Sequence, residues 1–307
     1  MNAQEPWDLD ALIGSYLQHQ RRTRGLREPT LYTYERFIRL FIQVSLGDDL
    51  IDPSQIAPTD VVAFFAAVRE RFSPRSMKTV RTALRSFLRF LRVEGLCEAS
   101  LEVAIPIVAH WRLSTLPRHL NDEQLARVLA SFHTDSPLGC RDCAIVLCLS
   151  TLGLRPGEVA GLRLDDIDWR AGTLTIPTRK TGRAATLPLP RDAGRALVAY
   201  LRKDRPATAE RRIFVKGLEP HRGERLSSNA ISAVAVRALR RAQVEPPLAG
   251  AYIFRHTVAT RLVRQGASLK EVADFLGHRS LDTTTIYAKL DLPALREVAL
   301  PWPEVLQ

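Results

Sequence analysis

Apolar side chains recur at the spacing of an α-helix through most of the first hundred residues, and this pattern constrains the fold more than any other feature. Amphipathic runs cover 9–17, 34–42 and 58–68, and Pro58 suits the first position of a helix. The pattern then fades between 99 and 116. We therefore predict an all-α N-terminal domain over residues 1–105, followed by a linker over 106–116.

A further helix is expected over 76–94, and it carries a cationic stripe. At 100° per residue its basic side chains fall within an arc of about 80°, away from the apolar face. The stripe consists of Lys78, Arg81, Arg85, Arg89 and Arg92. An ordinary solvated face would usually mix acidic with basic residues, whereas this one has almost no acid before Glu94. We predict that the stripe contacts phosphates, with plain solvent exposure as the alternative.

Helical patterns return from 117 onward but enclose β-prone runs at 173–176 and 185–189, which predict a small antiparallel sheet. Lys180 would lie near the tip of the hairpin that joins them. Asn121 suits a helix N-cap, 140–152 reads as a buried helix, and a capping box begins at Ser268. The expected fold class is mainly α with a small antiparallel β-sheet. Its α+β second domain covers 117–307 and includes a C-terminal tail from about 291.

The charge balance indicates a polyanionic partner. Lysine and arginine exceed aspartate and glutamate by 11, and the sequence pI is about 10.0. Nucleic acid fits this excess better than a membrane surface does. No apolar run is long enough to cross a bilayer and no leader pattern opens the chain, so we expect a cytosolic protein.

The four cysteines favour buried thiols over a metal centre. Cys140 and Cys143 have a Cys-x-x-Cys spacing, but no second pair or His-x-x-x-His follows them. The surrounding residues are those of a buried helix. No metal site and no cofactor are expected.

Two further segments could carry chemistry. Pro156 suggests that a helix starts just after Arg155, so that this arginine would lie at an electropositive helix N-terminus suited to an anion. His278 precedes Tyr287 by nine positions. A nucleophilic tyrosine needs cationic groups around it, because a phenol ordinarily ionises only near pH 10. The alternative is structural, with His278 capping a helix and Tyr287 packing in a core.

Four motifs together resemble the tyrosine recombinases, also called the phage integrase family. They are Gly-Leu-Arg-Pro-Gly-Glu-Val at 153–159, Lys180 in a hairpin, Phe-Arg-His-Thr at 254–257, and Leu-Gly-His-Arg-Ser at 276–280 with Tyr287. The resemblance covers nearly the whole second domain. The helical first domain resembles that family's core-binding domain.

The resemblance implies site-specific exchange of DNA strands, as in integration, excision or transposition, without a metal. Tyr287 would attack the scissile phosphate to give a 3′-phosphotyrosine and a free 5′-hydroxyl. Arg155 and Arg255 would stabilise the transition-state charge, and His278 would hydrogen-bond a phosphate oxygen. Lys180 would protonate the leaving 5′-oxygen. Glu158 matches a family acidic position and would orient a cationic side chain.

One position departs from the family pattern. The second motif is usually His-x-x-Arg, but Tyr252 stands three residues before Arg255. A phenol can donate a hydrogen bond to phosphate, and we predict that Tyr252 does so, but it is a far weaker base than imidazole. His256 is expected to be structural rather than a substitute, because the next position on a helix points elsewhere.

The resemblance also implies double-stranded DNA as partner and a tetramer on two DNA sites. The tail after 291 would dock on a neighbouring subunit or fold back on its own. Two alternatives remain for the function: a DNA-binding protein that has kept the fold and lost the chemistry, and a type IB topoisomerase-like enzyme.

Overall fold

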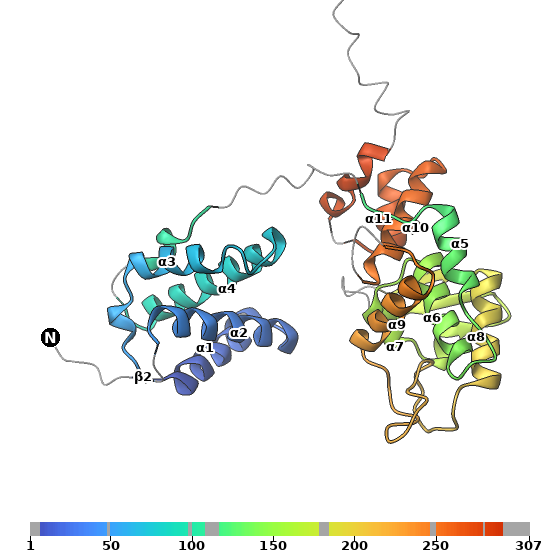
Figure 1. The fold of residues 1–307 in the computed structure, drawn as a ribbon, viewed down its shortest axis with the longest axis horizontal. Coiled ribbons are helices and arrows are strands. Elements are labelled where there is room, and N and C mark those ends of the chain that lie inside the picture. The colour runs from blue at the N-terminus through green and yellow to red at the C-terminus, as the bar shows by residue number, and fades with distance from the viewer. Residues whose placement is uncertain are drawn as a thin grey trace, which may run out of the picture. The chain divides into compact units, whose positions relative to one another are not determined.

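The computed structural model describes residues 7–47, 50–97, 100–107, 117–177, 184–245, 250–278 and 280–290. The chain forms two compact units that divide between Trp111 and Arg112 (Figure 1). This division falls inside the expected linker, of which residues 108–116 lie outside the described part of the chain. The C-terminal tail expected from about 291 also lies outside it.

The first unit packs its helices around one apolar core. Its elements are β1 (Trp7–Asp8), α1 (Leu9–Arg24), α2 (Glu28–Ser45), β2 (Leu50–Ile51), η1 (Pro53–Gln55), α3 (Pro58–Val68), α4 (Pro74–Val93) and η2 (Leu101–Ala104). The predicted helical character of this unit is confirmed. The structure adds an antiparallel pair between β1 and β2, with Trp7 opposite Ile51. Strands of two residues are too short to show an alternating pattern in the sequence.

Local sequence signals account for the placement of α4. Ser73 accepts a hydrogen bond from the Ser76 backbone N–H at 3.2 Å, and Pro74 fills the first helical position. The apolar face buries Phe87 completely, and its ring meets that of Tyr16 edge-on with centroids 5.4 Å apart. Burying this face leaves the basic stripe of the same helix on the other side, where Arg85 and Arg89 are exposed.

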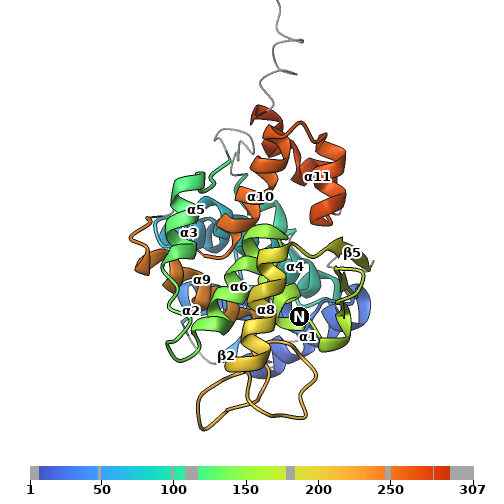
Figure 2. The same cartoon turned by 90° about the vertical axis from the view of Figure 1, so that its right-hand side faces the viewer.

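The second unit is assembled around α6, the helix predicted to be buried. Its elements are α5 (Asp122–Ala130), α6 (Gly139–Thr151), α7 (Pro156–Gly161), η3 (Leu164–Asp166), β3 (Ile167–Asp168), β4 (Thr173–Ile176), β5 (Ala185–Pro188), α8 (Arg191–Lys203), α9 (Ser228–Arg241), α10 (Tyr252–Arg264), α11 (Leu269–Leu276), η4 (Leu281–Thr283) and η5 (Thr285–Leu290). Helices α8, α9 and α10 all pack against α6 (Figure 2). Ala144, Ile145 and Leu149 on α6 are fully buried.

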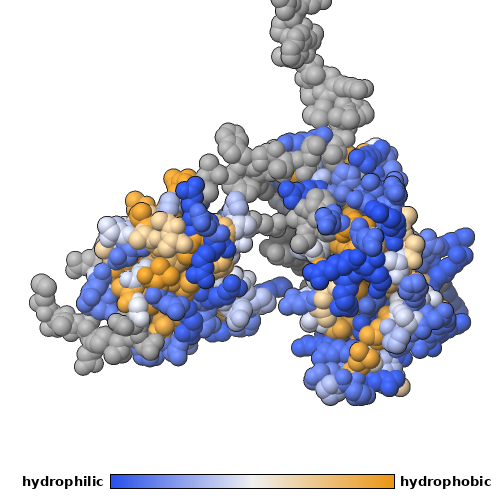
Figure 3. Space-filling model, in the orientation of Figure 1, coloured by the Kyte–Doolittle hydropathy of each residue, from blue (hydrophilic) through white to orange (hydrophobic). Residues whose placement is uncertain are grey.

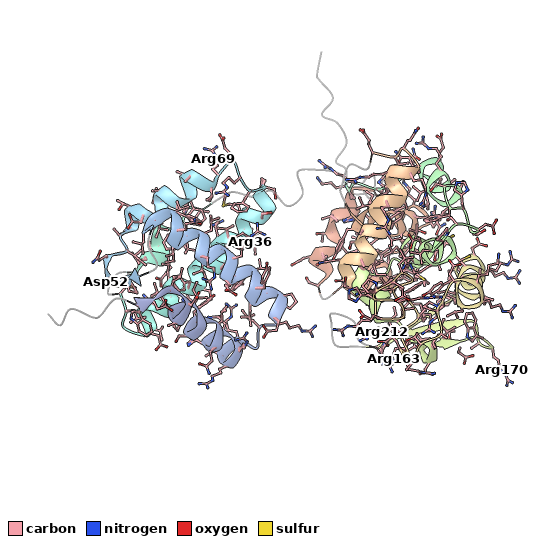
Figure 4. The ribbon with its side chains drawn as sticks, turned by 60° about the horizontal axis from the view of Figure 1, so that its bottom comes forward. Arg36, Asp52, Arg69, Arg163, Arg170 and Arg212 are labelled. Atoms are coloured by element: carbon pink, nitrogen blue, oxygen red, sulfur yellow. The ribbon has the colours of Figure 1, made fainter. Side chains whose placement is uncertain are left out.

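The predicted small antiparallel sheet is confirmed, and its strands lie in the order β3-β4-β5. Leu174 lies opposite Leu187, so the two buried residues share the face that turns toward the core. Beside the sheet, Arg163 and Arg212 form an isolated antiparallel bridge and lie close together in Figure 4. Residues 178–183, which include Lys180, lie outside the described residues.

None of the four cysteines forms a disulfide, and Cys97, Cys140 and Cys148 are buried. On the face that Figure 3 shows, hydrophilic residues cover much of each unit and apolar patches lie among them. Within the described ranges, no helix combines the length and the apolar character that crossing a membrane requires.

Candidate active site

Arg155 is fixed at the start of α7 by Glu158. One carboxylate oxygen accepts the Arg155 backbone N–H at 2.8 Å, and the other accepts from Nη1 at 2.7 Å. The side chain of Arg155 is 17% exposed and that of Glu158 is 6% exposed, so little water reaches the ion pair. The other guanidinium nitrogen, Nη2, donates to the carbonyl of Gly277 at 3.1 Å. Arg155 therefore reaches across 122 positions of sequence to the end of α11.

Arg255 is buried on α10 and bonds to the same two segments. Its Nη1 donates to the carbonyl of Gly153 at 2.6 Å, and its Nη2 donates to the carbonyl of Leu276 at 2.5 Å. Burial lowers the pKa of Arg255 to about 10, and the nearby charge of Arg155 acts in the same direction. The guanidinium therefore remains charged near neutral pH, and the two arginines lie near enough to repel each other.

Glycines allow these segments to come together. Gly153 has a φ of +61°, and a Cβ there would lie 2.7 Å from Cδ2 of Leu276. Gly277 ends α11 in the left-handed conformation with a φ of 64°. These two glycines thereby bring the end of α11 and the residue after Gly277 close to the two arginines. That residue is His278.

His278 is oriented by a buried threonine. Its Nδ1 lies 2.7 Å from Oγ1 of Thr284, and Thr284 has no exposed surface. Thr284 is a site residue that was not predicted, because a threonine between short 3-10 turns gives no signal in the sequence. A hydrogen bond at Nδ1 fixes the ring plane of a histidine and directs Nε2 away from that partner.

Tyr287 lies on η5, which packs against α10 and α11. It is 1% exposed. Burial raises the pKa of its phenol above the ordinary range, while the charge of Arg255 acts in the opposite direction. Its hydroxyl lies 2.6 Å from Nδ1 of His256.

This contact corrects the expectation that the side chain of His256 points elsewhere. Residues 256, 259 and 263 follow the i, i+3, i+7 spacing of one helix face. Ala259 and Val263 pack in the same small cluster as Tyr287, so His256 also faces η5. The sequence therefore contained a signal that His256 shares a helix face with Ala259 and Val263. We missed it because we considered only the position of His256 next to Arg255.

Of the two other predicted catalytic residues, only Tyr252 lies in the described part of the chain. Tyr252 is the first residue of α10 and is 49% exposed, and its electrostatic influence reaches Arg255. Lys180 lies outside the described residues. In the described part of the chain, no three histidine, cysteine or acidic side chains are grouped in a way that could hold a metal ion.

Family models account for both units. The model described as "Phage integrase family" matches residues 118–292, and "Phage integrase, N-terminal SAM-like domain" matches residues 13–95. The chain belongs to the phage integrase family.

Among curated members of the family, the putative integrase/recombinase y4rA of Sinorhizobium fredii is 42% identical over 298 residues, which is 97% of this chain and 72% of that protein. The tyrosine recombinase XerD of Listeria monocytogenes is 30% identical over 295 residues, covering 94% of this chain and 97% of XerD. The fold of this family member also resembles a crystal structure of the XerH site-specific recombinase bound to palindromic difH substrate. The TM-score is 0.76 at 20% identity, with 99% of each chain covered.

The basic stripe of this integrase-family member borders a groove in the first unit. A hollow of about 460 Å³ lies between α1 and α4, and its lining includes Arg24, Arg85 and Arg89. Arg24 was not among the predicted phosphate contacts, although it belongs to a last helical turn rich in arginine.

The predicted stripe is not uniform along α4. Lys78, Arg85 and Arg89 are exposed, and Arg81 is half-buried. Arg92 instead donates to Ser100 at 2.7 Å and pairs with Glu102 at 3.0 Å, so its charge is already compensated within the unit. The part of the stripe that lines the groove is therefore carried by Arg85 and Arg89.

Proposed function

We propose that this protein cuts and rejoins double-stranded DNA at specific sites, with Tyr287 as the nucleophile. One observation carries the proposal. Arg155 and Arg255, which are 100 positions apart, both donate to the carbonyls at the end of α11, immediately before His278. Tyr287 returns to the same place on η5, where it is near enough for the charge of Arg255 to influence its phenol. Two cations, an imidazole and a phenol therefore meet at one site.

This arrangement suits phosphoryl transfer. The transition state spreads negative charge over the non-bridging oxygens, so that fixed cations lower the barrier with little reorganisation. Arg155 and Arg255 are preorganised by hydrogen bonds to carbonyls and to Glu158. In the proposed reaction they stabilise that charge and His278 donates to a phosphate oxygen. Lys180 supplies the proton to the 5′-oxygen, and Tyr252 donates a hydrogen bond to the phosphate.

The attack stores the energy of the broken bond in a 3′-phosphotyrosine. Attack by the 5′-hydroxyl of a partner strand then releases the enzyme, and no external energy source or cofactor is needed. Strand exchange requires two duplexes and several active sites, so we propose that the protein self-associates as a tetramer on two DNA sites.

The first unit would hold the duplex by its phosphates. Arg24, Arg85 and Arg89 line a groove open to solvent, and guanidinium groups bind phosphate through paired hydrogen bonds. An enzyme that acts on DNA must be located where that DNA is, and we therefore propose a cytoplasmic location, at the nucleoid when DNA is bound.

The test uses nicked duplexes that tile the DNA flanking the gene, with wild type and Tyr287→Phe compared side by side. Binding is scored on a native gel and covalent attachment on a denaturing gel. Attachment by wild type alone supports the proposal and locates the cleaved phosphate. Binding without attachment by either protein would indicate a DNA-binding protein that has lost the chemistry. Covalent attachment of the Tyr287→Phe variant to DNA would show that Tyr287 is not the nucleophile.

A further inference from the structure

The hydroxyl of Tyr287 lies within hydrogen-bonding distance of an imidazole nitrogen. Its oxygen lies 2.6 Å from Nδ1 of His256, with the ring centroids 5.8 Å apart. We propose that His256 is the catalytic base that takes the proton of Tyr287 during attack on DNA, in place of the histidine that this chain lacks at Tyr252. This inference rests on the proposed function, because it assigns a role within the same reaction.

The geometry suits proton transfer. A distance of 2.6 Å lies at the short end of hydrogen bonds and within the reach of a general base. The phenol donates when His256 is neutral and carries its own proton on Nε2, because Nδ1 then offers a lone pair. His256 and Arg255 are consecutive residues of α10, so one helix presents both the base and a transition-state cation.

The burial of Tyr287 creates the need for a base. The side chain belongs to an apolar cluster that includes Val258, Ala259 and Val263, and a phenolate in such surroundings lacks the hydration that stabilises its charge. The pKa of Tyr287 is raised accordingly. Very little phenolate exists near neutral pH, so attack is easiest when the proton leaves as the bond to phosphorus forms.

Tyr252 is poorly suited to this task. A phenol accepts a proton far less readily than an imidazole does, and Tyr252 is 49% exposed at the first position of α10. His256 follows one turn later and is half-buried against η5. In the proposed reaction, Tyr252 therefore donates a hydrogen bond to the phosphate, and His256 accepts the proton of Tyr287.

The step balances in atoms and charge. The O–H bond of Tyr287 breaks and its proton passes to Nδ1 of His256, while the phenol oxygen forms a bond to phosphorus. The bond from phosphorus to the 5′-oxygen breaks, and that oxygen takes a proton from Lys180. Rejoining reverses each transfer, and His256 returns the proton to Tyr287. Because Tyr287 is 1% exposed, η5 must shift locally to admit the phosphate.

The experiment measures the single-turnover rate of covalent attachment on the cleaved nicked duplex, for wild type and His256→Asn. Asparagine places an amide oxygen near the position of Nδ1, where it accepts a hydrogen bond but takes no proton. We expect attachment to slow by about 10²-fold or more, the range for general base catalysis. His256→Gln serves as a second non-basic variant, and His133→Gln, on an exposed loop, is the matched control.

Two additional substitutions separate a base from a purely structural contact. Replacing Tyr287 by 3,5-difluorotyrosine gives a more acidic phenol, which needs less help in losing its proton. The defect of His256→Asn should therefore shrink in that background, whereas a packing defect would persist. A duplex with sulfur in place of the leaving 5′-oxygen should rescue Lys180→Ala, because a thiolate leaves without protonation, but should not rescue His256→Asn.

The outcomes are distinct. Attachment by His256→Asn at the wild-type rate, or faster, overturns the assignment while leaving the proposed function intact. An equal defect with tyrosine and difluorotyrosine also overturns it. If the wild-type protein never becomes covalently attached to DNA, the proposed function itself is wrong. DNA binding and thermal unfolding of each variant establish that it is folded.

Discussion

Oγ1 of Thr284 lies 2.7 Å from Nδ1 of His278, and the threonine is fully buried. The contact joins the turn between η4 and η5 to His278, the second residue after α11. It therefore orients the imidazole and also ties the segment that carries Tyr287 to the rest of the site.

Thr284→Val should slow DNA attachment about 5-fold. Valine keeps the shape but removes the hydroxyl, so His278 loses the partner that fixes its ring, and a partner of this kind is worth about 1 kcal/mol. The measurement is the single-turnover rate of attachment. Thr284→Ser, which keeps the hydroxyl, is the control and should remain within about two-fold of wild type. Equal rates for valine and wild type would show that His278 is oriented by other contacts.

Glu158→Ala should destabilise the second unit by roughly 3 kcal/mol, because it leaves the guanidinium of Arg155 poorly compensated in a largely buried setting. Denaturant unfolding followed in that unit measures the change. Glu123→Ala, an exposed position on α5, is the control and should shift the unfolding free energy by less than about 0.5 kcal/mol. A stability loss no larger than that of the control would mean that Arg155 does not depend on the pair.

Arg85→Ala combined with Arg89→Ala should weaken DNA binding and reduce the slope of log affinity against log salt by about 2, because each arginine neutralises about one phosphate. Binding is measured at several salt concentrations. Arg21 and Arg39 make a matched pair of controls, because each is already ion-paired, with Glu28 and with Asp10 and Glu35. Their double alanine variant should leave the slope nearly unchanged. If the salt slope of the Arg85 and Arg89 double variant is also unchanged, the basic face of α4 is only exposed to solvent and does not contact phosphates.

Arg92→Ala should change the salt slope less than Arg85→Ala does, although both residues belong to the stripe predicted from the sequence. Its guanidinium is paired with Glu102, so releasing it to bind phosphate would cost an existing interaction. The slopes of the two single variants, measured in the same salt series, make the comparison. Equal effects would show that this pair opens on binding.

The protein should lose stability above pH 10, in part through its buried tyrosines. Burial raises the pKa of Tyr16 to about 12, and the side chain has no exposed surface. The unfolded phenol ionises near pH 10, so between pH 10 and 12 the folded state binds more protons than the unfolded state. The stabilisation is complete below pH 10 and falls by about 1.4 kcal/mol per pH unit above it. Unfolding of wild type and Tyr16→Phe at pH 9 and 11 measures this, and the phenylalanine variant should show the shallower decline.

The sequence alone determined most of the secondary structure, because the signals are local. Asn121 caps α5, Pro156 opens α7, and Ser268 with Glu271 forms the box that starts α11. The spacing of apolar residues likewise indicated the buried helix α6 and the basic face of α4. The motifs around Arg155, Arg255, His278 and Tyr287 identified the family before any geometry was known.

Only the tertiary structure decided how those residues meet. The bond from Arg255 to Gly153 spans 102 positions, and the contact of His256 with Tyr287 spans 31. Such contacts depend on how α10, α11 and η5 pack, and no local pattern encodes them. The sequence therefore indicated a nucleophile and its cations, but the position of His256 next to Arg255 led to the expectation that its side chain points elsewhere. Packing of η5 against α10 brings the hydroxyl of Tyr287 to Nδ1 of His256, because buried polar groups are more stable with a hydrogen-bonding partner.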